Sequence, residues 1–215
     1  MLCLAGVFVL LLSVTTEARV GNSSESSFCT ETEECLLYDL VCEGNGYEVR
    51  HYEPFKVVTT EVESYFTVIA AVRGFRTLAG YVTGHNAAGT GISMTTPVIM
   101  KRKENRSKQL TSVYEISFVL PSHYQTNPPA PIDESVKIVD MPDMHVYVRS
   151  YGGWFFDIMS RIQTYLLRRQ LNSAQASYNT EYHFDVGYNS PMTIKDRHNE
   201  VWYVVEGEPV CPASE

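Results

Sequence analysis

Residues Asn45 to Pro54 read NGYEVRHYEP, and they predict a β-hairpin. Asn-Gly between two β-prone runs is the strongest short-range hairpin signal, and here CLLYDLVC precedes the pair while YEVRHY follows it. Because the side chains of a strand alternate between its two faces, Tyr47, Val49 and His51 share one face of the second run. The hairpin therefore places a histidine on the face of a sheet, where it either binds a ligand or only contacts a neighbouring group or water.

The sequence after the hairpin predicts a strand, a helix and two further strands. Residues 55–62 (FKVVTTEV) are rich in β-branched side chains, as strands are. From residue 64 to 82, apolar residues recur at spacings of three and four, which indicates an amphipathic helix. The apolar stripe comprises Tyr65, Val68, Ile69, Val72, Phe75, Ala79 and Val82. Of the helix residues, we expect Val72, Phe75, Leu78, Ala79 and Val82 to face the sheet. Residues 95–102 (TTPVIMKR) and 110–121 (LTSVYEISFVLP) then predict strands on either side of a basic loop.

The second half of the chain repeats this plan. Strand patterns lie at residues 136–140, 144–151, 182–192 and 200–206. Residues 154–171 indicate a second amphipathic helix, and its apolar stripe comprises Phe155, Ile158, Met159, Ile162, Tyr165 and Leu166. Each half also holds a Pro-containing triplet, Thr95-Thr96-Pro97 in the first and Asn189-Ser190-Pro191 in the second. We therefore predict one pseudo-symmetric α+β domain, with a mostly antiparallel curved sheet and two helices against it.

The N-terminus predicts export. Residues Leu2 to Val14 are almost wholly apolar and are followed by polar sequence, which is typical of a secretory signal peptide. No later stretch approaches the roughly 20 apolar residues that a membrane span requires. We expect residues 1–18 to be removed, residues 19–34 to form a flexible segment, and residues 35–211 to form the single domain of a secreted, extracellular protein.

Cysteines and glycosylation motifs fit an exported chain. Four cysteines remain after the signal peptide, and an even number in an exported chain implies disulfides with three possible connectivities. They are Cys29, Cys35, Cys42 and Cys211. A zinc site would require short paired spacings with neighbouring histidines, so disulfides are favoured, with a slight preference for Cys211 tying the tail to the N-terminal region. The acceptor motif of N-glycosylation occurs at Asn22 and at Asn105.

Charge and motifs argue against two classes of function. The formal net charge is −8, whereas nucleic-acid binding depends on neutralising phosphates with Lys and Arg, so we expect no nucleic-acid partner. No nucleophile elbow, phosphate-binding loop or zinc-protease motif occurs in the sequence, so we expect no enzyme. The histidines other than His51 are scattered without metal-ligand spacing, and we assign them no role; they are His85, His123, His145, His183 and His198.

Five collinear segments resemble the SOUL haem-binding protein family. They are YEVRHYEP, GISMTTPV, NPPAP with SVKIVD and VYVRSYGGW, GYNSPM, and NEVWYV, and they extend over about residues Cys35 to Glu206. The resemblance implies a distorted β-barrel with two long helices, built from two similar halves. It also implies non-covalent binding of haem or of other tetrapyrroles as the small-molecule partner.

The resemblance implies two possible positions for the ligand. In one branch of the family the histidine of the YE-x-RHY motif is the proposed axial iron ligand, and that residue is His51 here. In another branch the porphyrin lies on an apolar surface near the first helix, with basic side chains near its propionates. The helix residues that would serve this second mode are Val72, Arg73, Phe75, Arg76 and Ala79. The family's basic helix positions align with Val72 and Gly80, so the two arginines are near them without being equivalent.

We therefore expect reversible haem or porphyrin binding outside the cell, for scavenging or carriage. Two alternatives stay open at this point: a secreted carrier of another flat hydrophobic ligand, and a protein-interaction module in which haem is incidental. The oligomeric state is not predicted.

Overall fold

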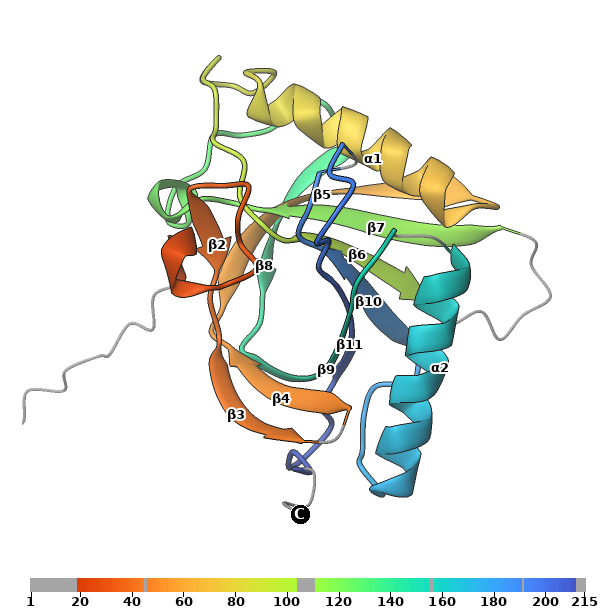
Figure 1. Ribbon diagram of the computed structural model, residues 1–215. Helices are drawn as coiled ribbons and strands as arrows, with labels where there is room; N and C mark the ends of the chain where they lie inside the picture. Colours follow the sequence, from red (N-terminus) through yellow and green to blue (C-terminus); the bar gives the residue numbers. More distant parts are fainter. Residues whose placement is uncertain (1–18, 45, 104–110, 155–156, 191, 212–215) are drawn as a thin grey trace, which may run out of the picture.

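The computed structural model describes residues 19–44, 46–103, 111–154, 157–190 and 192–211. Within these ranges nine strands form one curved antiparallel sheet, in the order β3-β4-β9-β11-β10-β6-β7-β5-β8. Two helices, α1 (Thr67–Val82) and α2 (Asp157–Ser173), pack against it (Figure 1). The strands are β3 (Asp39–Gly44), β4 (Tyr47–Tyr52), β5 (Phe55–Ser64), β6 (Val98–Lys103), β7 (Ser112–Val119), β8 (Val136–Met141), β9 (Met144–Tyr151), β10 (Tyr182–Gly187) and β11 (Asn199–Val204).

The strand order shows the internal symmetry. The series β4, β5, α1, β6, β7 repeats as β8, β9, α2, β10, β11. The two series are joined by three antiparallel pairs, β6 with β10, β4 with β9, and β5 with β8. Pro54 and Pro142 occupy equivalent turns, between β4 and β5 and between β8 and β9. The Pro-containing triplets are not equivalent, because Pro97 directly precedes β6 whereas Asn189 follows β10. The duplication therefore lies in the elements, and the similarity of the triplets is incidental.

Alternating side chains divide the core between the two faces of the sheet. Val57, Val148 and Trp202 are buried in the interior of the curved sheet. Val58, the neighbour of Val57, is buried beneath α1, and Tyr147, the neighbour of Val148, is buried beneath α2. Both helices thus cover the outer face, and the inner face packs on itself. The predicted pseudo-symmetric α+β fold with a distorted antiparallel barrel is confirmed; among the described strands β3 and β8 are the sheet edges, so the barrel is open.

The predicted hairpin forms, and its turn requires glycine. Gly46 has a φ of +98°, a conformation that side chains with a Cβ rarely adopt. A Cβ at this position would also lie 1.9 Å from Nε2 of Gln170 on α2. Arg149 on β9 donates from Nη1 to the carbonyl oxygen of Gly46 at 2.7 Å. The turn is therefore held between the sheet and the second helix.

The predicted orientation of α1 is partly wrong: Leu78 and Val82 face the sheet as expected, whereas Val72 and Phe75 are exposed. The helix buries Thr67, Ala70, Gly74, Leu78, Tyr81 and Val82. Most of the large apolar side chains of the predicted stripe are exposed instead; they are Tyr65, Val68, Ile69, Val72 and Phe75. The physical reason is close packing, because a Cβ on Gly74 would lie 2.7 Å from Cδ1 of Ile116 on β7. The small residues Ala70 and Gly74 on the buried face let the helix approach the sheet. Of the apolar stripe, only Val82 is fully buried and Ala79 partly so.

The second helix has the same arrangement. Its buried side chains are Ser160, Thr164, Leu167 and Leu171. The predicted apolar stripe again points outward, with Ile158, Met159, Ile162 and Tyr165 exposed and Leu166 half-buried. Phe155 lies outside the described residues. The two halves therefore share an outward-facing apolar helix surface as well as their topology.

Residues 19–34, which we expected to be flexible, close the interior of the barrel. The short strand β1 (Val20–Asn22) pairs with β2 (Glu34–Leu36), and the 3-10 helix η1 (Ser23–Glu25) lies between them. Val20, Cys29 and Cys35 are buried in the interior cluster, and Phe28 packs against it. Apolar side chains in a polar segment thus anchor the segment to the barrel.

The structure selects one of the three disulfide connectivities. Cys29 bonds to Cys35, and Cys42 on β3 bonds to Cys211. Cys211 therefore ties the C-terminal tail to strand β3.

The predicted processing sites are only partly within the described residues. The side chain of Asn22 is exposed, and its Oδ1 accepts a hydrogen bond from the backbone N–H of Ser24 at 2.9 Å. Residues 1–18 and Asn105 lie outside the described residues. Signal peptide and glycosylation stay predictions. Neither described helix is long and apolar enough to cross a membrane.

Candidate ligand-binding site

His51 lies on β4 between two other strands of the sheet. It is opposite Asp39 of β3 on one side and opposite His145 of β9 on the other. Its Nε2 is 2.9 Å from Oδ2 of Asp143 in the turn between β8 and β9, and its Nδ1 is 3.9 Å from Oδ2 of Asp39. The side chain is 24 % exposed. Each ring nitrogen of His51 therefore faces a carboxylate within the protein.

His145 stacks on this histidine. The two imidazole rings lie with their centroids 4.7 Å apart and their planes 30° apart. Residue 145 is also in the lining of a cavity of about 560 Å³, which we call the edge pocket because it lies beside the edge strand β8. Residues of β6, β7, β8, the β8–β9 turn, the start of β9, β10 and the end of β11 surround it. Sequence reasoning assigned His145 no role, because MHVYV has no ligand motif and only the strand pairing brings it beside His51.

The edge pocket combines an apolar wall with a charged rim. Its apolar lining includes Val139, Met141, Met144, Phe184 and Val204. Its charged lining comprises Lys101, Glu115, Asp140 and Asp143, and the ammonium group of Lys101 lies 4.2 Å from the ring centroid of Tyr182. A volume of a few hundred Å³, a mainly apolar lining and a few convergent polar groups are the usual features of small-molecule sites. The edge pocket therefore has the composition of a site for a largely apolar molecule that carries polar groups.

A buried ion pair fixes the strands next to this pocket. Arg50 of β4 donates from Nη1 to Oε1 of Glu200 on β11 at 3.0 Å, and both side chains are almost fully buried. The carboxylate of Glu200 also accepts from Trp202 at 2.6 Å and from Tyr188 at 3.2 Å, and it lies 2.6 Å from Nε2 of His198. The guanidinium group of Arg50 lies over the ring of Tyr38 at 4.0 Å.

Within this network both Glu200 and Arg50 stay charged. Burial raises the pKa of Glu200, but the charge of Arg50 and the hydrogen bonds from His198 and Trp202 outweigh burial, so its pKa lies below the usual range. Burial lowers the pKa of Arg50, but the neighbouring Glu200 stabilises its charged form, and the pKa lies above the usual range. Strand β4, which carries His51, is thereby joined to β11 through the interior of the barrel. Local sequence patterns do not predict this contact, since the two residues are 150 positions apart.

The helix residues that the resemblance implied form a separate surface. Val72 is 55 % exposed and Phe75 is 40 % exposed; Arg73 and Arg76 are exposed beside them, and Ala79 is half-buried. Helix α1 packs mainly on β5, β7 and β8. Figure 1 shows α1 along the top of the molecule and β4, the strand of His51, near the bottom. The structure therefore does not bring His51 together with the helix residues.

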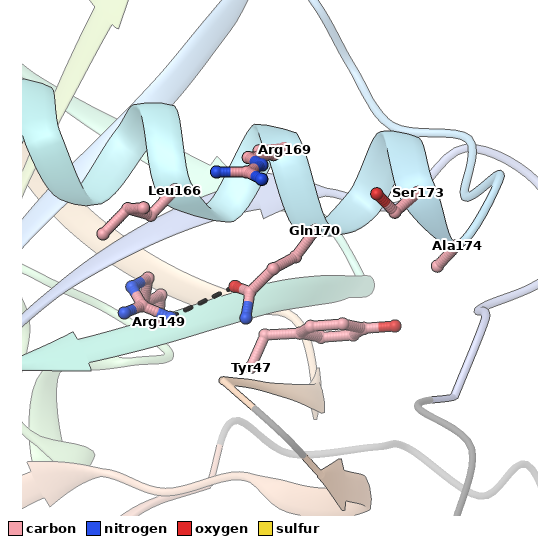
Figure 2. Close-up of a pocket in the computed structure, with 7 residues that line it drawn as sticks. All are labelled: Tyr47, Arg149, Leu166, Arg169, Gln170, Ser173 and Ala174. Atoms are coloured by element: carbon pink, nitrogen blue, oxygen red, sulfur yellow. Dashed lines mark hydrogen bonds between the residues drawn. The ribbon is translucent and has the colours of Figure 1, made fainter.

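A further hollow of about 480 Å³ lies beneath the C-terminal half of α2 (Figure 2). Its lining includes Tyr47, Arg149, Leu166 and Arg169. The Arg149 guanidinium donates to Gln163 at 2.8 Å and to Gln170 at 3.1 Å, in addition to the turn of Gly46. Because these bonds fasten the helix to the hairpin, we interpret the hollow as the surface of a structural clamp. Within the described ranges, no three or more His, Cys, Asp or Glu side chains are placed to hold a metal ion.

Comparison with known proteins identifies relatives over most of the chain. A family model described as SOUL heme-binding protein matches residues 33–204. Heme-binding protein 2 of Mus musculus is 35 % identical over 171 residues, which cover 80 % of this chain and 83 % of the relative. Heme-binding protein 1 of Bos taurus is 34 % identical over 162 residues, which cover 75 % and 84 %.

Similar solved structures agree on the fold. The C-terminal domain of EcmrR superposes with a TM-score of 0.56 at 11 % identity, over 79 % of this chain and 98 % of that chain. A hydrolase from Listeria innocua superposes with a TM-score of 0.52 at 10 % identity, over 77 % and 94 %. At these identities the likeness extends to the fold alone.

Proposed function

Because the chain belongs to the SOUL haem-binding protein family, we propose that it binds haem reversibly and without a covalent bond in the edge pocket. The observation that carries this proposal is the edge pocket itself, a cavity of about 560 Å³ with an apolar wall at the end of the barrel where the motif residue His51 and its neighbour His145 lie. The relatives are named for binding haem, and we propose binding without catalysis for this chain as well.

The apolar residues of the pocket fit the macrocycle of haem. They would cover its faces, and Lys101 would attract a propionate, whereas Glu115, Asp140 and Asp143 would repel one. Haem supplies an iron that accepts an imidazole nitrogen as axial ligand. Covalent attachment would require a Cys-x-x-Cys-His motif, and the sequence has none. Other porphyrins of the same shape fit the same wall.

We further propose that binding takes place outside the cell, in scavenging or carriage of free tetrapyrrole. The predicted signal peptide, the two disulfides and the acceptor motif at the exposed Asn22 support this location. Expression of the full chain in animal cells tests it. Secretion of a protein whose apparent mass falls on glycosidase treatment supports the proposal. Retention of the unprocessed chain inside the cells contradicts it.

A second candidate function has its own observation. Helix α1 carries a contiguous series of exposed apolar side chains at Val68, Ile69, Val72 and Phe75. Arg73 and Arg76 lie beside them. Exposed apolar patches on soluble proteins mark ligand or protein contacts. The helix surface therefore favours either porphyrin binding at α1 or contact with another hydrophobic partner.

Hemin titration followed at the Soret band distinguishes these sites. Met141→Glu introduces a carboxylate into the wall of the edge pocket, and Phe75→Glu introduces the same group on α1. We expect saturable binding in the wild type and at least about tenfold weaker binding in Met141→Glu, equivalent to about 1.4 kcal/mol. Phe75→Glu should bind within about twofold of the wild type. The reverse pattern would move the site to α1, and a wild type that leaves the hemin spectrum unchanged would refute haem binding.

A further inference from the structure

We infer that the edge pocket also binds bulky organic cations, which are apolar molecules that carry a positive charge. This inference goes beyond the proposed haem binding, because it names a second class of ligand for the same cavity. It follows from the charged side chains that point into the cavity and from the sign of their summed charge.

Two charged side chains of the edge pocket point into the barrel. Lys101 of β6 lies opposite Glu115 of β7 on one side and opposite Phe184 of β10 on the other. Directly opposed residues of neighbouring strands share one face of a sheet, and Phe184 belongs to the interior cluster. Lys101 and Glu115 are both half-buried. Their charges therefore lie beside the apolar wall of the pocket and are less exposed to solvent than charges on the outer surface.

Carboxylates outnumber cations around this pocket. Its lining combines one ammonium group with three carboxylates, which are those of Glu115, Asp140 and Asp143. Asp140 forms an ion pair with Lys56 of β5, and Oδ2 of Asp143 lies 2.9 Å from Nε2 of His51. Within the described part of the chain, no Lys or Arg lies within ion-pair distance of Glu115. Glu115 is therefore the charge of the pocket that a bound cation would neutralise.

The aromatic ring of Tyr182 lies in the same negative field. Burial raises the pKa of the Tyr182 phenol. Neighbouring carboxylates raise this pKa further, and they are those of Glu181, Glu206 and Glu115. The ammonium group of Lys101 lies 4.2 Å from the centroid of the ring, within the distance of about 6 Å over which an aromatic face attracts a cation. The pocket thus already holds one cation against its aromatic wall.

The size of the cavity and its lining define the ligand class. A cavity of about 560 Å³ has room for a drug-sized molecule, and the apolar wall favours one with little polar surface. A positive charge on that molecule would be attracted by Glu115 and by the Tyr182 ring. An apolar anion of the same size would contact the same wall but would be repelled by the three carboxylates.

Two ions of the same shape and opposite charge test the inference, namely tetraphenylarsonium and tetraphenylborate. Isothermal titration calorimetry of the purified protein in a sodium buffer measures both affinities. We expect tetraphenylarsonium to bind at least about tenfold more tightly than tetraphenylborate at low salt, because like charges in a pocket are costly. This preference should decrease in high salt, which screens the carboxylates.

Single substitutions assign the preference to the pocket. Glu115→Gln keeps the size of the side chain and removes its charge, so the preference should fall by at least about fivefold. Lys101→Met removes the cation of the pocket, and tetraphenylarsonium should then bind more tightly than in the wild type. Glu134→Gln is the matched control, because Glu134 is exposed in the segment before β8 and does not line the pocket, and it should behave as the wild type.

Three results would overturn the inference: tetraphenylborate binding as tightly as tetraphenylarsonium, neither ion binding, or a preference that Glu115→Gln leaves unchanged. Far-ultraviolet circular dichroism of each variant establishes that folding is unchanged. Hemin titration of the same preparations separates this inference from the proposed function. A preference for the cation in a protein that does not bind hemin would support the inference and refute haem binding.

Discussion

Arg50 and Glu200 form a buried contact on which the geometry of the histidine pair depends. Arg50 precedes His51 on β4, and its partner Glu200 is on β11, so the ion pair joins two strands that are separated by β9 in the sheet. Both side chains are at most 1 % exposed. Burying two charges is costly unless each is paired and hydrogen-bonded, and here the additional partners of Glu200 meet that condition. Arg50, whose side chain points into the barrel, thus positions the neighbouring His51, whose side chain points outward.

Arg50→Met tests this contact by leaving the Glu200 carboxylate buried without its cation. Removing one partner of a buried ion pair typically costs about 3–5 kcal/mol, and we expect a loss of unfolding free energy of that size at pH 7. Urea unfolding followed by tryptophan fluorescence measures it. A loss below about 1 kcal/mol would show that the hydrogen-bonded carboxylate does not need Arg50.

The same pair predicts how stability changes in acid. Because the pKa of Glu200 is lower in the folded than in the unfolded chain, its contribution is present above the usual glutamate pKa of about 4.5 and is lost as pH falls through the lower folded value. In Arg50→Met burial prevails and raises that pKa, so protonation of Glu200 should stabilise the variant. We expect the wild type to lose stability between pH 5 and pH 3 more steeply than the variant. Parallel pH curves would contradict the assigned role of Arg50.

At the scale of elements, the sequence predicted which segments are helices and strands, with ends displaced by a few residues. Strand β9 was predicted at its observed bounds. The start of α1 was predicted three residues before its observed first residue, Thr67, and its end was predicted at the observed residue. The buried face of α1 was not predictable from periodicity, because the helix sequence TVIAAVRGFRTLAGYV is apolar on most sides. The buried face is determined by the close approach of the helix to Ile116 on β7, and this approach depends on the assembled sheet.

Two glycines of α1 allow that packing to be tested with an internal control. Gly74→Ala places a Cβ 2.7–2.9 Å from three side-chain atoms of the buried Ile116, whereas Gly80→Ala meets nothing within 4 Å. Overpacking costs about 1–3 kcal/mol, and alanine in a helix gains up to about 1 kcal/mol over glycine. We therefore expect Gly74→Ala to be less stable than Gly80→Ala by about 2 kcal/mol in thermal or urea unfolding. Equal stabilities would mean that α1 does not rest on the sheet through Gly74.

At the scale of the whole molecule, sequence and structure differ most in how distant segments meet. The order of elements, the antiparallel sheet and the duplicated plan were predictable, because each depends on local periodicity and turn residues. The pairing of His51 with His145 and the separation of His51 from Phe75 were not, because they depend on strand order and register. The family motif predicted His51 as a candidate ligand residue. The register of β4 with β9 places His145 beside it.

The two disulfides should contribute unequally to the stability of the whole molecule. Cys42–Cys211 closes a loop with a sequence separation of 169, and Cys29–Cys35 closes one of only 6. In the chain-entropy account these loops correspond to about 5 kcal/mol and about 2 kcal/mol, respectively. We expect the double variant Cys42→Ser/Cys211→Ser to lose more unfolding free energy than Cys29→Ser/Cys35→Ser. Guanidinium unfolding of the two variants checks this order, and the opposite order would show that the N-terminal loop governs stability.

Locating the iron in crystals of the hemin complex tests the account most directly. Anomalous diffraction measured across the iron absorption edge identifies the metal by its own scattering. We predict one iron peak in the edge pocket, among the apolar residues Met141, Met144 and Phe184. An iron peak over Val72 and Phe75 on α1, or one bound directly to His51, would contradict the account.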